Sequence, residues 1–167
     1  MEDIPLEEEA GFEEFRARVA GTNISEKTLL ATDYLNHFNE IVMLFDMLPD
    51  MPDMIEACKE WQPKTYAEHF ADSTFSDRQL AIEAYGWVPA RFRRPFEETI
   101  AQINTLILTS VARLERDIAD GIDPDALRLA CSSVSRAAQT LMDRASAIIH
   151  GSDRAMDQSE IDGLLGN

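Results

Sequence analysis

The sequence predicts an all-α protein: a helical bundle with three long helices, a proline-rich region of short helices and a short C-terminal helix. Apolar residues recur every three or four positions over long segments, which is the period of an amphipathic helix. No segment shows the alternation of apolar and polar residues that is typical of a strand. Five of the seven prolines lie between Pro49 and Pro95, and proline interrupts helices because it lacks a backbone N–H.

The first long helix is expected to begin at Asn23, because Asn23 and Glu26 have the spacing of a capping box. Proline at position 49 ends it. Its apolar face is broad enough to make this helix central, and it also leaves a homodimer possible if the other long helices do not cover it. The apolar row of this face consists of Leu30, Tyr34, Ile41, Leu44 and Leu48.

Three short helices are expected in the proline-rich region, at about 52–60, 64–71 and 77–86. Ser76 and Gln79 have the spacing to cap the last of them. The region is too long and too apolar to be a plain linker. We therefore expect a compact helical subdomain that lies over one end of the bundle.

The remaining two long helices are expected to form an antiparallel hairpin. One runs from Pro89 or Pro95 to Asp120 and is followed by glycine, a frequent C-terminal residue. The other runs from Pro124 to His150. An aspartate directly before Pro124 supplies an N-cap followed by proline at the first helical position.

Composition limits the classes of partner. Acidic residues outnumber basic ones by 31 to 15, for a net charge of −16, which argues against binding to nucleic acid or to an anionic membrane. Neither Cys58 nor Cys131 lies in a metal-ligand spacing, and we expect no cofactor. The start of the chain lacks a signal-peptide pattern, and no apolar run approaches the length of a membrane span. These features favour a cytoplasmic protein.

The C-terminal segment has the pattern of a short amphipathic helix. Ile161, Leu164 and Leu165 stand at i, i+3 and i+4, so they share one narrow apolar face, while Asp162 points away from it. A helix of about eight residues is marginal alone in water. It therefore either packs on its own domain or becomes ordered on a partner.

This segment resembles the amino-terminal peptide of flagellar motor switch proteins, which docks on the phosphorylated chemotaxis response regulator. The chemotaxis phosphatase carries a comparable docking helix at its carboxyl terminus. The resemblance covers about a dozen residues, and Gly163 stands where the switch peptide usually has alanine. It implies a response-regulator receiver domain as partner. The implied contact residues are Gln158, Glu160, Ile161, Asp162, Leu164 and Leu165.

The chain accordingly divides into an acidic arm, a helical domain and a docking tail. The arm covers residues 1–20 and is expected to be mobile, with helical character from about Glu7 onward. The helical domain covers residues 21–151. Residues 152–167 form a linker and the C-terminal docking helix.

The resemblance to the phosphatase also implies where catalysis would occur. That family presents an acidic residue and a glutamine one turn apart on a long helix; the acid contacts the partner, and the glutamine orients the water that attacks the phosphoryl group. Glu98 and Gln102 have this spacing, and Gln139 and Asp143 have it in reverse order. A solvated helix face explains either pair better than a catalytic site does, so whether the chain is an enzyme stays open, with binding favoured.

A third group of candidates contains histidine. His37 falls in an apolar row with Glu40 three residues later, as in a metal-ligand pair of a bundle core. The simpler interpretation is a structural histidine whose ring is held by Asp33, because a buried polar group needs a hydrogen-bond partner. His69 lies in the aromatic stretch 66–70, which either lines a pocket or fills the core of the short-helix region.

Three functions follow from these patterns. The first is a regulatory adaptor that binds a chemotaxis-type response regulator in motility or two-component signalling. The second is a phosphatase of that regulator, acting through Glu98 and Gln102. The third is a helical metal- or small-molecule-binding protein with His37, Glu40 and His69 at its site. We favour the first, because the body of the chain has no motif of comparable detail.

Overall fold

The structure is a computed structural model that describes residues 6–152 together with Ile161, Gly163 and Leu164. These described residues form α-helices and two short 3₁₀ helices, with no strand among them. The all-α class is therefore confirmed. No helix in this part of the chain combines the length and the apolar character needed to traverse a bilayer.

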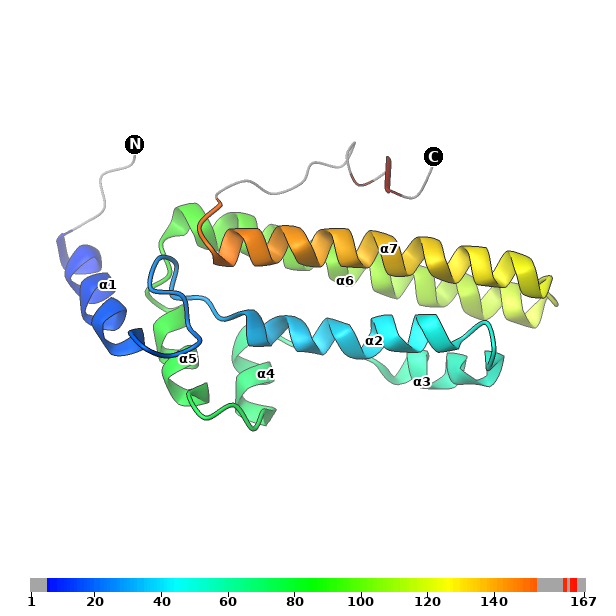
Figure 1. Ribbon diagram of the computed structural model, residues 1–167, viewed down its shortest axis with the longest axis horizontal. Helices are drawn as coiled ribbons and strands as arrows, with labels where there is room; N and C mark the ends of the chain where they lie inside the picture. Colours follow the sequence, from blue (N-terminus) through cyan, green and yellow to red (C-terminus); the bar gives the residue numbers. More distant parts are fainter. Residues whose placement is uncertain (1–5, 153–160, 162, 165–167) are drawn as a thin grey trace.

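Three helices form the frame of the bundle (Figure 1): α2 (Asn36–Met47), α6 (Ala90–Ala119) and α7 (Pro124–Ile149). The predicted hairpin is confirmed, because α6 and α7 pack along each other in opposite directions, and α2 packs against α7. Of the two starts left open for α6, the helix takes the earlier and contains Pro95. The side chain of Asp123 accepts two backbone N–H groups at the start of α7, as its position before a proline predicted.

The predicted start of the first long helix at Asn23 is wrong. The chain instead forms an irregular loop, then the 3₁₀ helix η1 (Thr32–Leu35), and only then α2. Ile24 pairs with Ala31 in an isolated antiparallel bridge, and Leu29 has a φ of 67°, which no α-helix accommodates.

Tertiary contacts stabilise this loop. The Oγ1 of Thr28 donates to the backbone oxygen of Ile149 at 2.5 Å, and the hydroxyl of Tyr66 accepts the backbone N–H of Ala31 at 2.9 Å. Leu29, Leu30 and Ala31 are all fully buried. A helix that packs on the core by one face would turn at least one of three successive side chains toward solvent, so this burial agrees with the irregular backbone.

The three predicted short helices are present as α3 (Ile55–Glu60), α4 (Tyr66–Asp72) and α5 (Arg78–Tyr85), with the 3₁₀ helix η2 (Pro52–Met54) leading into α3. They do not gather at one end of the bundle as expected. Helix α3 packs on α2 and α6, whereas α4 packs on α5 and η1 toward the opposite end (Figure 1). The short helices thus share the side of the bundle that no long helix occupies.

The caps of these short helices differ from the prediction. Asp77, not Ser76, precedes α5, and it makes no side-chain cap bond. A complete capping box instead starts α4: the backbone N–H of Glu68 donates to the Thr65 hydroxyl, and the backbone N–H of Thr65 donates to the Glu68 carboxylate, both at 3.1 Å.

Helix α1 (Leu6–Val19) realises the helical character expected in the acidic arm. Its carboxyl-terminal half packs on the domain: Phe15 and Val19 are buried, and the ring of Phe15 stacks on that of Trp87 with the ring centroids 6.0 Å apart. A Cβ atom at Gly11 would lie 2.1 Å from the Trp87 ring, so this close approach requires glycine.

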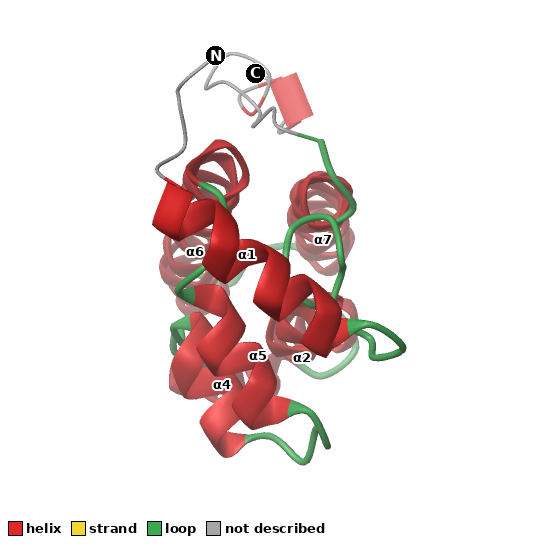
Figure 2. Ribbon diagram, turned by 90° about the vertical axis from the view of Figure 1, so that its left-hand side faces the viewer, coloured by secondary structure: helices red, strands yellow, loops and turns green. Residues whose placement is uncertain are grey.

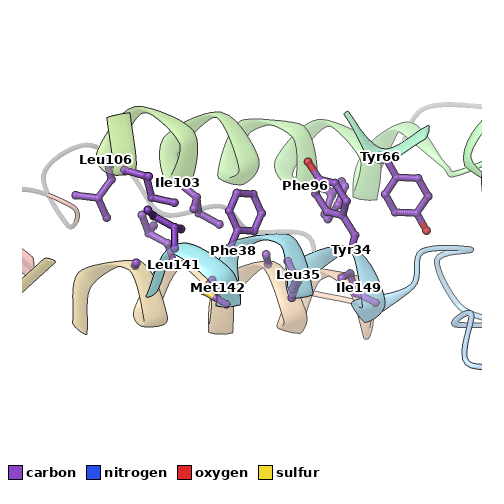
Figure 3. Packing of buried hydrophobic residues seen from close by; sticks show 14 of the residues in the cluster. Tyr34, Leu35, Phe38, Tyr66, Phe96, Ile103, Leu106, Leu141, Met142 and Ile149 are labelled. Carbon is purple, nitrogen blue, oxygen red and sulfur yellow. The ribbon is translucent and has the colours of Figure 1, made fainter. Parts of the chain in front are cut away.

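One hydrophobic core runs through the bundle. Figure 3 shows side chains from α6, α7 and the η1–α2 segment meeting in a single layer. Both cysteines, Cys58 and Cys131, are buried free thiols. The fully buried large side chains of this layer include Tyr34, Phe38, Phe96, Ile103 and Leu141.

Candidate functional site

The segment predicted to dock, at the C-terminal end of the chain, is described at three positions. Ile161, Gly163 and Leu164 are helical, and they lie beside the layer of α6 and α7, away from α2 (Figures 1 and 2). Ile161 is only 8% exposed and belongs to the hydrophobic core, and Leu164 is partly buried against that core. The other predicted contact residues, Gln158, Glu160, Asp162 and Leu165, lie outside the described residues.

This arrangement has two consequences. The i, i+3 pair Ile161 and Leu164 shares one face, as the sequence predicted, whereas Gly163 is exposed and a Cβ added there would meet nothing within 4 Å. The apolar face rests on the domain's own core in this structure. A partner that uses the same face must therefore displace it.

The second candidate pair lies on α6. Glu98 is exposed, whereas Gln102 is partly buried and its side-chain oxygen Oε1 is fully covered. The covered oxygen is the atom that would accept a hydrogen bond from a water molecule on a partner's phosphoryl group, so in this conformation Glu98 is the more exposed member of the pair. Gln139 and Asp143 on α7 bond to each other instead, with Nε2 donating to Oδ1 at 3.1 Å.

His37 is a structural histidine, with a partner that the sequence did not predict. Its side chain is nearly buried, its Nε2 lies 2.7 Å from the backbone oxygen of Gln62, and its ring stacks on Trp61 at 4.7 Å. The indole of Trp61 donates in turn to the backbone oxygen of His37 at 3.1 Å. Asp33 does not hold this ring; its carboxylate lies 3.0 Å from the Nε2 of His69.

The expected Asp33–His37 contact assumed one continuous helix through both residues. Asp33 lies in the 3₁₀ helix η1, whose turns contain three residues, so its side chain points to a different side from that of His37. The ring centroids of His37 and His69 are 6.4 Å apart, and the carboxylate of Glu40 is 4.0 Å from the Nδ1 of His37. Nowhere in the described ranges do three or more His, Cys, Asp or Glu side chains form a group that could hold a metal ion.

Burial lowers the pKa of His37, and the hydrogen bond to the Gln62 carbonyl and the charge of Glu40 oppose that shift only in part. The neutral imidazole is therefore favoured in the folded protein.

Lowering the pH from 7.5 to 5.5 is expected to destabilise the wild-type protein more than a His37→Gln variant. The folded-state pKa lies below the unfolded value of about 6.5, so the unfolded chain takes up the proton first. The stability that His37 contributes is present above the unfolded pKa and is lost as the pH falls through it toward the folded pKa. Urea midpoints at each pH measure the loss.

His150→Gln, at an exposed position, is the control and should leave the pH profile of the wild-type protein unchanged. A His37→Gln profile identical to that of the wild-type protein would contradict the prediction.

A groove of about 500 Å³ opens between the 63–68 segment and α6. Tyr66, Ala67 and Glu68 line it, so part of the aromatic stretch does border a pocket, while Tyr66 and Phe70 are also buried in the core. Its tyrosine hydroxyls already have partners within the protein. Tyr34 donates to the backbone oxygen of Lys64 and Tyr85 donates to Glu97, each at 2.6 Å.

These phenols stay neutral: burial raises the pKa of Tyr34 to about 12. The tyrosine hydroxyls of the groove are therefore already engaged, whereas the Oδ1 of Asn104 in its lining is covered and has no hydrogen-bond partner among the described residues.

Comparison with known proteins adds no relative. No protein-family model, curated protein or solved structure matches the chain. The functional argument rests on the residues themselves.

Proposed function

We propose that the protein is a regulatory adaptor that binds the receiver domain of a chemotaxis-type response regulator through residues 158–165. In this proposal the protein acts in the cytoplasm, in motility or two-component signalling. Its helical domain carries the docking helix, and no catalytic group is required.

The observation that carries the proposal is the geometry of the tail. Ile161 and Leu164 are helical and lie on one apolar face, with the exposed Gly163 on another. Peptide helices that dock in a partner's groove present such i, i+3, i+4 anchors. The pattern agrees with that of the motor switch peptide, whose partner is a phosphorylated receiver domain.

Titration of the full-length protein with receiver domains from the same organism tests this function, with and without a phosphoryl mimic on the receiver. Binding should tighten with the mimic. Leu164→Ala/Leu165→Ala should weaken it more than tenfold, because each leucine that is buried at an interface contributes about 1.5–3 kcal/mol.

A matched control is Leu108→Ala/Leu129→Ala, which removes the same atoms from exposed positions on α6 and α7. It should leave the affinity unchanged. The proposal fails if no receiver domain binds, or if both double variants bind as well as wild type.

Gly163→Ala is expected to strengthen binding of the isolated peptide 152–167 about fivefold. Alanine is favoured over glycine in a helix by about 1 kcal/mol, and Gly163 lies away from the apolar face of Ile161 and Leu164. Fluorescence anisotropy of the labelled peptide measures the change. Ser152→Ala, which lies before the docking helix, serves as the control. An unchanged affinity for Gly163→Ala would mean that the tail does not bind as a helix.

A further inference from the structure

A row of exposed methionines lies along the outer side of α2. Met43, Met47 and Met51 are 63%, 40% and 51% exposed. The backbone N–H of Met51 donates to the oxygen of Met47 at 3.0 Å, so the helical turn continues beyond the end of α2. Residues four apart share a helix face, and the three thioethers therefore form one row about 12 Å long.

This row differs from exposed apolar side chains that stand singly on a protein surface. Single exposed apolar side chains are normal, such as Leu108 on α6 and Leu129 on α7. Neighbouring exposed apolar residues that are rimmed by polar ones mark interaction surfaces instead. Methionine suits such a surface, because its flexible and polarisable side chain adapts to different apolar partners.

Acidic side chains surround the methionine row. Glu40 lies between Met43 and the start of α2 with a side chain that is 73% exposed, and Asp50, 70% exposed, lies beside Met51. Asp46 and Asp53 are exposed on the same stretch. One cation lies close by: Arg128 of α7, which is 2.6 Å from Asp50. The rim therefore favours a cationic occupant.

A second copy of this chain is a poor occupant. Its own methionine row would bring an identical acidic rim, and each chain carries a net charge of −16. Like charges that face each other across an interface oppose association.

We propose that the methionine row docks a basic amphipathic helix of another protein. The apolar face of that helix would lie on Met43, Met47 and Met51, and its lysines or arginines would lie against Glu40, Asp46 and Asp50. This is helix-in-groove recognition, with adaptable thioethers in place of a fixed pocket. The surface is separate from the C-terminal tail, so it does not depend on the function proposed above.

The test uses the full-length protein with ¹³C-labelled methionine methyl groups, observed by two-dimensional NMR. The probe is a synthetic 14-residue peptide of leucine and lysine with helical apolar spacing. A peptide of the same composition in scrambled order, without an apolar face, is the charge control. The helical peptide should shift the signals of Met43, Met47 and Met51 but not that of the buried Met142, and it should bind at least tenfold more tightly than the scrambled one.

A triple variant, Met43→Gln/Met47→Gln/Met51→Gln, should weaken that binding at least tenfold. Glutamine has a similar length and helix propensity, and these positions are exposed, so the fold should persist. Leu108→Gln/Leu129→Gln, a comparable change on the other helices, should bind as wild type does.

Four outcomes would overturn the inference. Equal binding of the scrambled peptide, or full binding by the triple variant, would mean that only net charge attracts the peptide. Absence of methionine shifts with the helical peptide would exclude the surface. Concentration-dependent dimerisation that moves the same three signals without peptide would identify a second copy as the occupant.

Discussion

Replacing Phe38 with alanine is expected to lower the free energy of unfolding by about 3–5 kcal/mol, because the change leaves a cavity at the centre of the core. Phe38 is fully buried. Its ring stands nearly perpendicular to that of Tyr34, with the ring centroids 5.7 Å apart, and its centroid lies 6.0 Å from that of Trp61. Phe38 therefore joins η1, α2 and the segment after α3. Chemical and thermal unfolding followed by circular dichroism measure the loss, and Tm should fall by roughly 10 °C for a domain of this size.

Phe75→Ala is the matched control. Phe75 is only partly buried, in the turn between α4 and α5, and its described ring contact is with Phe70 at 5.4 Å. The same truncation there should cost clearly less, because fewer contacts are lost and water can fill the space. Equal losses for the two variants would contradict a core that is centred on α2.

The long helices could be predicted because their signals are local. Apolar spacing along α6 and α7 repeats over seven or more turns, and Asp123 before Pro124 starts α7 with the cap that the structure contains. The prolines likewise separated the short helices at nearly the observed positions. Each of these signals acts through the backbone of a few neighbouring residues, and at these positions no tertiary contact overrides it.

The loop before η1 could not be predicted, because distant contacts determine it. Asn23 and Glu26 carry a local helix-start signal, but Thr28 bonds to Ile149, which is 121 residues away in the sequence, and Leu29 adopts a positive φ. Tertiary burial of three successive residues outweighs a cap that contributes about 1 kcal/mol. The ring partner of His37 was missed for a similar reason, since it is the backbone oxygen of Gln62 and has no side-chain signature.

The surface sites also have a part that local spacing predicts and a part that tertiary contacts decide. The shared face of Ile161 and Leu164 follows from spacing alone, and their burial agrees with it. Spacing does not reveal what covers such a face. It also placed Ile41, Leu44 and Leu48 in the apolar row of the first long helix, and Ile41 and Leu48 are fully buried while Leu44 is partly buried. The exposed methionines of α2 were not singled out by that row.

The burial of Ile161 leads to the last prediction: the isolated peptide 152–167 should bind a receiver domain more tightly than the full-length protein does. In the full-length chain the apolar face of the tail already rests on the domain, with Ile161 8% exposed. Binding then draws only on the fraction of molecules whose tail is released, and the apparent Kd rises as that fraction falls.

The size of this effect follows from the burial. Covering an isoleucine side chain contributes about 1.5–3 kcal/mol, and ordering the tail offsets part of that gain. A net 1.4 kcal/mol corresponds to a factor of ten, so we expect the peptide to bind up to about tenfold more tightly. Titration of one receiver domain with both ligands measures the ratio, and a peptide with Leu164→Ala/Leu165→Ala supplies the baseline.

The possible outcomes separate two questions. Equal affinities of peptide and full-length protein would leave the adaptor function standing but would mean that packing on the domain does not restrain the tail. Failure of both to bind would instead remove the response regulator as the partner. A tighter peptide would mean that the domain regulates its own docking helix, so that any interaction which loosens Ile161 from the core raises the affinity for the receiver domain.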